Sequence, residues 1–422
     1  MSAVRSPYTR TAWYNRAARV EPGRDHIFSQ VDEEKHTKRR QQMAAGYSGK
    51  ENTDLEPTID KYVTQLLSLI RREYISTPSV QYKPMDLARI AQYLTLDVIS
   101  DIGFGQAFGD LASNSDVDAY IKSSEQGLFA ISLTCASGLL PILQWPPIAR
   151  FVGPSEKDKS GIGKVLGTAR RMIDDRLKSE TQNKTDMLAA FMRHGLTRDD
   201  LFTEAWLQII AGSETTATAI RGTMLYIMAN PRVYAKLQRE VDDTVATGLA
   251  PQIVPDAVAR EMAYLQAVLR EGFRIHPPVT DIVPKRVPKG GDTVTVDGKT
   301  VFLPGGTNVG YSVFGLNSRT DIFGDDAGHF RPERWIVDPD GGNAEHVAAM
   351  KRTTELIFGY GKYQCLGKNI AWMEYSKVIF EFLRNFDFAI ARPEKPLKEH
   401  NYVGIFVAHG QHVVVTKRGI NA

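Results

Sequence analysis

The segment FGYGKYQCLG, residues 358–367, holds Cys365, one of only two cysteines in a chain of 422 residues. Apolar residues at helical spacing follow it and predict a helix that begins after Gly367. The free amides at a helix N-terminus stabilise an anion and lower the pKa of a thiol beside them. Gly361 and Gly367 leave room for a flat partner to approach. The segment therefore indicates either a thiolate that binds a soft metal ion or a buried, inert thiol.

Composition restricts the classes of function that remain open. Two cysteines exclude a disulfide framework and any four-cysteine zinc or iron–sulfur site. The 52 basic and 49 acidic side chains leave a net charge of +3, which is too small to indicate nucleic-acid binding. The nine histidines include no pair at the helical spacing of metal ligands, and no phosphate-binding loop is present.

The sequence AGSETT, residues 211–216, lies in the middle of a long apolar helix expected over residues 197–230. Glycine inside a helix costs about 1 kcal/mol relative to alanine, and a buried carboxylate must be paired or protonated. One interpretation is a core helix that is bent by hydroxyls bonding back to the preceding turn. The other is a widened groove in which Glu214 and Thr215 hold water and pass protons.

Glu271 and Arg274 are three residues apart in a helix expected over residues 256–275, so they meet on one face. Such pairs are usually solvated and contribute little to stability. The segment FRPERW, residues 330–335, supplies Arg334. It raises a second possibility, a buried network in which the Glu271 carboxylate offsets two guanidinium charges.

The hydrophobic pattern predicts a mainly helical protein with a minor β region in its C-terminal third. Helical spacing dominates up to about residue 278, after which glycine and proline turns separate short β-prone runs. The tail HVVVTKRG, residues 412–419, predicts a final strand. The uncharged stretch 126–149 has the length of a membrane span, but its prolines would break such a helix. It therefore predicts a buried segment or a surface that dips into a bilayer.

The motifs at residues 211–216, 271–274, 330–335 and 358–367, in this order, resemble those of the cytochrome P450 superfamily, the haem-thiolate monooxygenases. The first resembles Ala/Gly-Gly-x-Asp/Glu-Thr-Thr, and the last resembles Phe-x-x-Gly-x-Arg-x-Cys-x-Gly. The overall texture is closest to fungal members similar to pisatin demethylase. The resemblance implies the cytochrome P450 fold, mainly α with a minor β region, apparently without the family's N-terminal anchor, first helices and first sheet strands.

The resemblance also implies one domain over residues 1–422. Its parts would be a helix-rich part over about 27–278, a β-containing part over about 279–357, a haem-ligand loop with the following helix over 358–386, and C-terminal strands over 387–422.

The resemblance further implies haem b, whose iron has Cys365 as its axial ligand. The segment HTKRRQQMAAGYS, residues 36–48, looks like the family's early haem-facing helix. In it His36 and Arg40 would meet a haem propionate, and Arg286 matches a position that often does the same. Where the family has an arginine two residues before the cysteine, this chain has Tyr363. The other residues expected around the haem are Phe358, Gly361, Gly367, Ala211 and Gly212.

The activity that the resemblance implies is oxidation of a small apolar molecule, as part of fungal secondary metabolism. O₂ would be activated with electrons from NADPH, delivered by NADPH–cytochrome P450 reductase docking near Cys365. Glu214 and Thr215 would be the catalytic residues that pass protons. The alternatives are a truncated haem-binding paralogue without activity, or a family member that catalyses desaturation, ring expansion or coupling.

Family topology places the candidate substrate contacts at Val279, Thr280, Asp281, Tyr402 and Ile405. The resemblance also places the protein at the cytoplasmic face of the endoplasmic reticulum membrane, although no transmembrane anchor is expected in this chain. Peripheral contact with the bilayer is expected from the uncharged region around residues 128–143.

Overall fold

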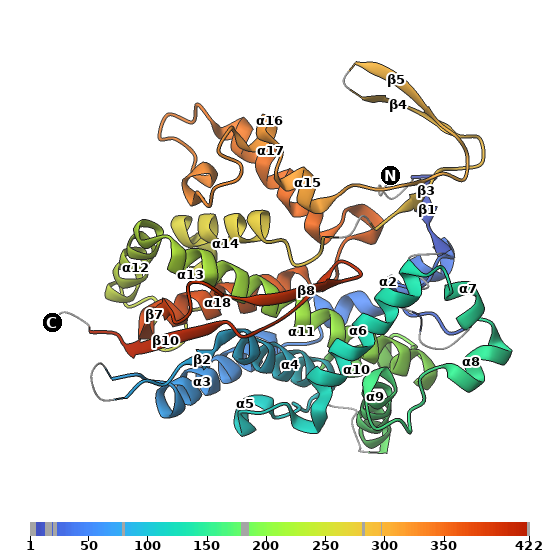
Figure 1. The fold of residues 1–422 in the computed structure, drawn as a ribbon, viewed down its shortest axis with the longest axis horizontal. Coiled ribbons are helices and arrows are strands. Elements are labelled where there is room, and N and C mark those ends of the chain that lie inside the picture. The colour runs from blue at the N-terminus through green and yellow to red at the C-terminus, as the bar shows by residue number, and fades with distance from the viewer. Residues whose placement is uncertain are drawn as a thin grey trace.

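The computed structural model describes residues 6–12, 19, 23–77, 81–178, 185–280, 283–296 and 298–419. Most of this part of the chain is helical, and strands form small sheets at its edges (Figure 1). The expectation of a mainly α fold with a minor β region is confirmed. The helices are α2 (Glu33–Tyr47), α3 (Leu55–Glu73), α4 (Leu87–Phe104), α5 (Asp110–Ser113), α6 (Tyr120–Ala136), α7 (Leu140–Leu143), α8 (Pro146–Val152), α9 (Gly161–Lys178), α10 (Met187–Arg193), α11 (Arg198–Ala229), α12 (Pro231–Ala246), α13 (Asp256–Glu261), α14 (Ala263–Ile275), α15 (Val313–Asn317), α16 (Thr320–Phe323), α17 (Ala344–Thr354) and α18 (Lys368–Asn385), with 3₁₀ turns η1 (Val117–Ala119), η2 (Pro332–Trp335), η3 (Glu355–Phe358) and η4 (Gly361–Tyr363).

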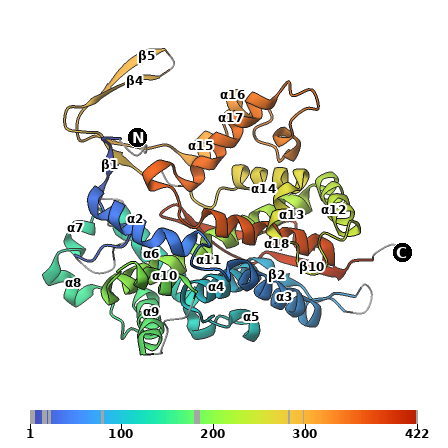
Figure 2. The ribbon, with the colours of Figure 1, turned by 180° about the vertical axis from the view of Figure 1, so that it is seen from behind.

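Helix α11, 32 residues long, crosses the middle of the molecule (Figures 1 and 2). It begins with a capping box, in which the Asp200 amide donates to the Thr197 hydroxyl and the Thr197 amide donates to the Asp200 carboxylate. It ends before Pro231, which has no amide to continue the hydrogen-bond ladder. Helix α4 packs along it, and α9, α14 and α18 also contact it. The AGSETT motif is thereby carried into the core.

The strands of the described residues form four small sheets. Their orders are β1-β3-β6, β2-β10-β7, β4-β5 and β8-β9. The strands are β1 (Thr9–Arg10), β2 (Met85–Asp86), β3 (Lys285–Arg286), β4 (Asp292–Val296), β5 (Lys299–Leu303), β6 (Asn308–Val309), β7 (Phe386–Ile390), β8 (Lys398–Tyr402), β9 (Ile405–His409) and β10 (His412–Lys417). The predicted hairpins after residue 279 and the predicted final strand are present as β4–β5 and β10.

The β1-β3-β6 sheet joins the first described residues to a strand much later in the chain. Thr9 pairs with Arg286, and Arg10 pairs with Lys285, in antiparallel register. Residues directly opposite each other in such a pair point to the same face of the sheet. Arg10 and Lys285 are both buried, whereas Arg286 is exposed. The pairing therefore sets two cations next to each other on the inner face.

The helix expected over residues 256–275 is in fact two helices, α13 and α14, which meet at Met262. The ψ angle of Met262 is 102°, which is extended and interrupts the helix. The Glu240 carboxylate accepts hydrogen bonds from the amides of Tyr264 and Leu265, each at 2.7 Å. A side chain from α12 thus caps the start of α14, an arrangement that no local pattern in residues 256–275 predicts.

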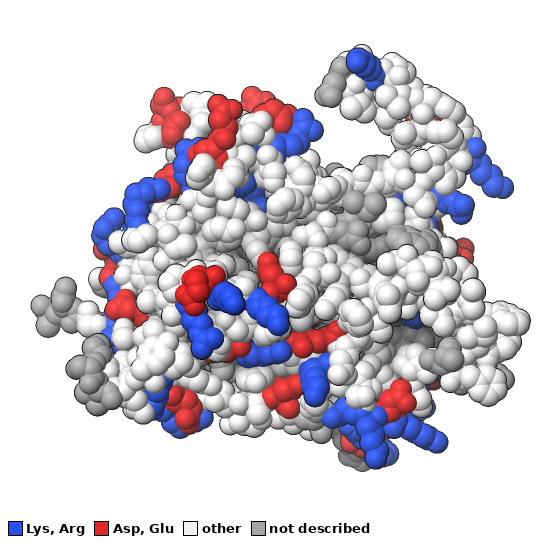
Figure 3. Space-filling model, viewed as in Figure 1, with Lys and Arg blue, Asp and Glu red and all other residues white. Residues whose placement is uncertain are grey.

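The uncharged stretch 126–149 runs through the end of α6, through α7 and into α8. Pro141 and Pro146 lie in the first turns of α7 and α8, so the chain turns instead of continuing as one helix. Among the described residues, no helix has the length and apolar content needed to cross a bilayer. The surface over α7 and α8 carries few charged side chains on the face shown in Figure 3. The large apolar side chains exposed in this region are Phe129, Leu133, Leu139, Ile142, Trp145 and Phe151.

Candidate functional site

A cavity of about 430 Å³ lies between α11 and the segment that carries Cys365. Side chains from α2, α4, α6 and the loop after α14 complete its wall. The residues predicted from sequence that line it are His36, Arg40, Ala211, Gly212, Thr215, Val279, Phe358, Tyr363, Cys365, Gly367 and Ile405. The predicted residues that do not line it are Glu214, Thr280, Arg286, Gly361 and Tyr402, and Asp281 lies outside the described residues.

Cys365 presents its thiol to the cavity from the loop just before α18. Its own amide donates to the Phe358 carbonyl at 2.7 Å, which closes the loop. The amides of Gly367 and Lys368 donate to the sulfur. Burial raises the pKa of the Cys365 thiol, and the two amides together with Arg40 oppose that rise. The sulfur therefore sits among donors that suit a thiolate, as the sequence predicts for a helix N-terminus.

Gly212 and Gly361 also have backbone roles that were not predicted. A Cβ on Gly212 would lie 2.5 Å from Ile99 Cγ1, so this glycine lets α11 approach α4 closely. Gly361 does not line the cavity, and its φ of 61° is the left-handed conformation that favours glycine. Gly367 and Ala211 line the cavity, and because glycine has no side chain and alanine only a methyl group, neither residue fills it.

Thr215 and Glu214 face different sides of α11, because adjacent helical residues point about 100° apart. Thr215 lines the cavity, and its hydroxyl donates to the Ala211 carbonyl at 2.7 Å. Glu214 is buried on the side toward α4, where it accepts a hydrogen bond from Gln92 and lies 3.6 Å from the Arg221 guanidinium. Burial raises the pKa of Glu214 to about 7, although Arg221 opposes the rise. The Thr215 hydroxyl thus bonds back to the preceding turn, as the first interpretation expects, whereas the passing of protons stays a prediction.

A chain of polar side chains leads from Glu214 toward the surface. The Gln92 amide oxygen accepts from Arg89 at 3.4 Å, and Arg89 donates to Glu125 at 2.6 Å. The Arg89 and Glu125 side chains are 27% and 20% exposed, so the chain ends at solvent. Sequence reasoning missed Gln92 and Arg89, since nothing in the local pattern of α4 distinguishes them.

Four basic side chains, Arg10, His36, Arg40 and Lys285, line one edge of the cavity, and we refer to them as the cationic edge. Arg40 donates to the Gln364 carbonyl at 2.6 Å. His36 is only 1% exposed, and neither ring nitrogen has a hydrogen-bond partner. Burial, followed by the charges of Arg10 and Arg40, lowers the pKa of His36 to about 3. These groups converge on a space that would suit a negatively charged group.

Tyr363, which replaces the expected arginine, lies within the cationic edge. Its hydroxyl donates to the carboxylate of Glu33 in the first turn of α2. Lys285 Nζ lies 4.4 Å and the Arg10 guanidinium carbon 4.8 Å from the centre of its ring. The uncharged Tyr363 ring therefore makes cation–π contacts with both Arg10 and Lys285.

Arg286, which was predicted to meet the cofactor, is exposed and does not line the cavity, whereas its neighbour Lys285 does. The reason is the two-residue period of a strand, which turns successive side chains to opposite faces. That period allows only one of the two residues to face inward, but it does not say which one.

The residues of the cavity fit haem b. Cys365 offers a sulfur that accepts from two amides, and the buried His36, whose ring nitrogens have no partner among the described residues, belongs to the cationic edge. Apolar side chains such as Phe358, Ile99 and Ile370 supply walls between them. A flat group with two carboxylates and a central metal ion would satisfy all three regions together.

The far end of the cavity is formed by two loops, and both contain strained valines. Val283 and Val403 have φ angles of 36° and 46°, values that a β-branched residue rarely adopts. Both line the cavity with the predicted contacts Val279 and Ile405. The amide of Thr280 donates to the Gly404 carbonyl at 2.9 Å and so ties the two loops together.

Tyr402 packs against a different region from the one predicted. Its ring lies 5.7 Å from that of Phe129 of α6, centre to centre, in an edge-on arrangement. This contact turns the side chain to the outside of the β8–β9 hairpin. Its neighbour Val403 does line the cavity.

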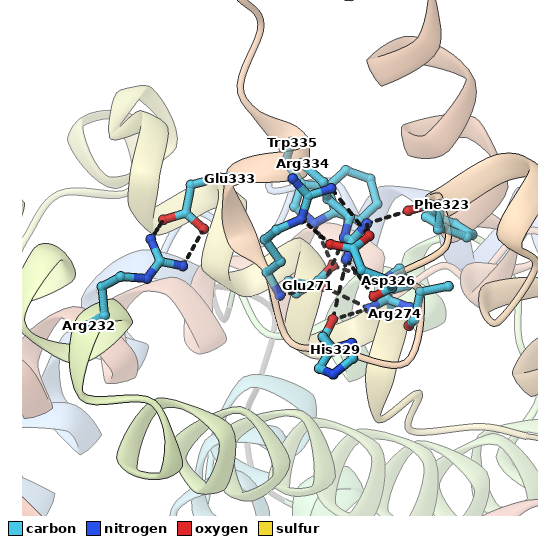
Figure 4. Close-up of polar contacts among 11 residues, drawn as sticks. Arg232, Glu271, Arg274, Phe323, Asp326, His329, Glu333, Arg334 and Trp335 are labelled. Carbon is cyan, nitrogen blue, oxygen red and sulfur yellow. Dashed lines mark hydrogen bonds and ion pairs between the residues drawn. The ribbon is translucent and has the colours of Figure 1, made fainter.

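The predicted network around Glu271 forms outside the cavity (Figure 4). Arg274 donates to both Glu271 oxygens at 2.8 and 2.7 Å, and Arg334 Nε donates to one of them at 3.0 Å. The Trp335 ring N–H adds a bond of 2.9 Å, and the Arg331 amide adds one of 2.8 Å. All three predicted side chains are buried, so the network is not a solvated pair.

Comparison with known proteins gives a consistent result. The family model described as Cytochrome P450 matches residues 3–414. Cytochrome P450 monooxygenase ABA1 of Pyricularia oryzae (strain 70-15) is 40% identical over 423 residues, covering 99% of this chain and 80% of the relative. Cytochrome P450 monooxygenase aba1 of Botryotinia fuckeliana (strain B05.10) is 35% identical over 419 residues, with the same coverages of 99% and 80%. Cytochrome P450 monooxygenase abl1 of Leptosphaeria maculans is 35% identical over 407 residues, covering 95% of the chain and 70% of the relative.

Proposed function

The chain belongs to the cytochrome P450 family of monooxygenases, and we propose that it binds haem b through Cys365 and oxidises a small, largely apolar molecule. The observation that carries this proposal is the position of the Cys365 sulfur. It receives the amides at the start of α18 and faces α11 across the cavity, beside the open face at Ala211. Bound haem would supply the activation of O₂, because a thiolate ligand favours cleavage of the O–O bond.

The chain's own residues hold and enclose the haem. Cys365 binds the iron, and the cationic edge neutralises the carboxylates of the porphyrin. Phe358 packs against Phe273 of α14, with their ring centres 5.3 Å apart, and this contact supports the loop that carries Cys365. The apolar walls exclude bulk water, which strengthens each electrostatic interaction inside the cavity.

Thr215 and Glu214 are proposed to deliver protons. The Thr215 hydroxyl lies at the cavity, whereas Glu214 connects to the surface through Gln92, Arg89 and Glu125. A carboxyl group with a pKa of about 7 holds a proton half of the time at neutral pH, which suits a general acid. Glu214 would take a proton from the surface side and release it, after rotation of its side chain, to water held by Thr215.

This role can be tested by comparing product with peroxide. Thr215→Ala should lower product per NADPH by about a hundredfold, the lower end of general acid–base contributions, while release of hydrogen peroxide rises. Glu214→Gln should do the same and should also flatten the dependence of the rate on pH near 7. Variants that lose NADPH consumption and product in equal proportion would contradict the proton-delivery role.

Substrate and redox partners follow from the lining of the cavity and from the family. The loops at Val279, Val283, Val403 and Ile405 present apolar side chains, so the proposed substrate is a small apolar molecule of fungal secondary metabolism. Electrons would come from NADPH through NADPH–cytochrome P450 reductase docking on the face outside Cys365. Turnover that depends on added reductase would support this partner.

Contact with the endoplasmic reticulum membrane is proposed for the apolar surface of α6, α7 and α8. Trp145 is 59% and Phe151 is 90% exposed, and interfacial apolar side chains of this kind bind bilayers. The double variant Trp145→Ser/Phe151→Ser should float less with phospholipid vesicles than the unaltered chain. A matched variant at the exposed but distant Tyr82→Ser should float as before.

The test of the proposed function is spectroscopic. The haem-loaded chain, reduced and exposed to carbon monoxide, should show the red-shifted Soret band of a thiolate-ligated haem. Cys365→Ser should abolish this band, whereas Cys135→Ser, on α6, should keep it. A histidine-like spectrum, or no uptake of haem, would overturn the proposal. A chain that shows the band but forms no product with reductase would be a haem protein without catalytic activity.

A further inference from the structure

Two members of the cationic edge, Arg10 and Lys285, were not among the residues predicted from sequence. Arg10 is 9% exposed and donates to the carbonyls of Ile27, Phe28 and Gln30, while its Nε has no partner. Lys285 is 6% exposed and donates to the Val283 carbonyl at 3.3 Å. In the part of the chain that the structure describes, no ion pair involves either side chain.

A buried cation without an acidic partner is unfavourable, because burial removes it from water and no opposite charge compensates. The cost shows in both side chains. Burial lowers the pKa of Arg10 to about 10 and that of Lys285 to about 8, although the nearby Glu33 charge opposes both shifts in part. Both groups line the cavity and are set side by side by the β1–β3 pairing. Their arrangement is that of a site which receives an anion from the cavity.

Tyr363 explains why these two positions carry the charge. The family's motif places an arginine there, and a third cation at this point would lie within about 5 Å of two others, where repulsion is strong. Instead, the Tyr363 hydroxyl is held by Glu33, and Glu33 also pairs with Lys362 at 2.9 Å. The fixed ring then packs against both Arg10 and Lys285.

We propose that Arg10 and Lys285 together bind the carboxylates of the haem, in place of the arginines that the family resemblance puts at positions 363 and 286. Tyr363 is a positioning residue that holds the two cations through its ring and is itself held by Glu33. This inference rests on the proposed function, since it requires haem in the cavity. It adds a rearranged anion site, built by two strands that are far apart in the sequence, β1 and β3.

The first experiment measures loss of haem from the loaded protein to an excess of apomyoglobin. Arg10→Gln and Lys285→Gln should each lose haem about tenfold to a hundredfold faster, the range expected for hydrogen bonds to charged groups. Arg286→Gln is the matched control from the same strand and should lose haem at the unaltered rate. Equal rates in all three variants, or faster loss in Arg286→Gln alone, would overturn the inference.

A second arm separates charge from fold. The same variants are loaded with haem dimethyl ester, whose carboxylates are blocked. With the ester, Arg10→Gln and Lys285→Gln should release it no faster than the unaltered chain. Faster release of both haem and ester would show a structural role and would overturn the inference. Failure of the unaltered chain to take up either group would overturn the proposed function itself, which makes the two failures distinguishable.

A third experiment tests whether a cation at position 363 can replace the one at position 10. Introducing Tyr363→Arg into the Arg10→Gln variant should restore haem retention by at least fivefold toward the unaltered value, because a cation returns to the same edge. Tyr363→Phe, which keeps the ring but loses the bond to Glu33, should accelerate haem loss only two- to fivefold. Absence of rescue by Tyr363→Arg would overturn the exchange between positions 10 and 363.

Discussion

The network around Glu271 and the cationic edge both bury arginine side chains, and they treat the charge in opposite ways. Around Glu271, the guanidinium groups of Arg274 and Arg334 share one carboxylate and further carbonyl acceptors. At the cationic edge, the hydrogen bonds that Arg10 and Lys285 make within the described residues go to carbonyls. The first region has its acid within the chain, whereas in our proposal the second is completed by the carboxylates of haem. Burial of an arginine thus does not distinguish a structural role from a binding role, but the presence of its acid does.

The largest expected effect comes from breaking the complete region. Glu271→Gln leaves the buried Arg274 without a carboxylate and leaves Arg334 with only the partly exposed Asp326, 3.1 Å away. Loss of one partner of a buried network costs about 3–5 kcal/mol. The free energy of unfolding, measured with denaturant, should fall by that amount, and little haem-loaded protein should be recovered.

The control for this variant is the exposed pair beside the network in Figure 4. Arg232 donates to Glu333 at 2.8 Å, but its side chain is 68% exposed. Arg232→Gln should change the free energy of unfolding by only about 0–1 kcal/mol, as exposed pairs do. A comparable loss in both variants would mean that the Glu271 network is no more structural than a surface pair.

A smaller effect is expected at the cationic edge, where Lys285 should make the free energy of unfolding depend on pH. In the fold the pKa of Lys285 is about 8, against 10.5 in its ordinary state. Between these values the unfolded chain keeps a proton that the folded chain has released, so the free energy of unfolding rises with pH. The rise should be on the order of 2–3 kcal/mol from pH 8 to pH 10.5. It should be absent in Lys285→Gln and reduced once haem is bound, when unfolding is followed at a series of pH values. A flat profile in the unloaded, unaltered chain would show that Lys285 already has a partner.

The smallest effect is expected at Glu33, the acid that contacts the cationic edge through Tyr363 and Lys362. Glu33→Gln removes a partly exposed ion pair and should lower the free energy of unfolding by about 0.5–1 kcal/mol. The amide oxygen of glutamine can still accept from Tyr363, so the ring stays held while the edge becomes more positive. Haem loss should therefore become slower, by roughly two- to threefold on the scale of one weak charge contact. A lower free energy of unfolding together with slower haem loss would support the contrast between the two regions. A lower free energy of unfolding together with faster haem loss would contradict it.

Features that depend on short spacings could be predicted from the sequence. The spacing of Glu271 and Arg274 places both on one helix face, and the glycines around Cys365 mark a loop before a helix. The limits of α11 follow from Thr197 and Pro231 in the same way. These predictions succeeded because each feature is determined by a few neighbouring residues.

Features that depend on long-range packing could not be predicted. The direction of Glu214 depends on the rotation of α11 against α4, which is fixed by contacts such as Gly212 against Ile99. The inward side chain of β3 is Lys285 because of its register with β1, and register is not encoded in two residues. The rearranged cationic edge was therefore visible only once distant strands were placed together.

The pairing of β1 with β3 couples the N-terminal segment to the occupancy of the cavity. A strand of two residues offers few hydrogen bonds, and its partner lies at residues 285–286, so a very long loop must close before it can dock. Docking of β1 is then expected late in folding. Carboxylates bound to both Arg10 and Lys285 would hold β1 against β3. The rate at which a protease cuts near residues 6–12 should consequently report whether the cavity holds its cofactor.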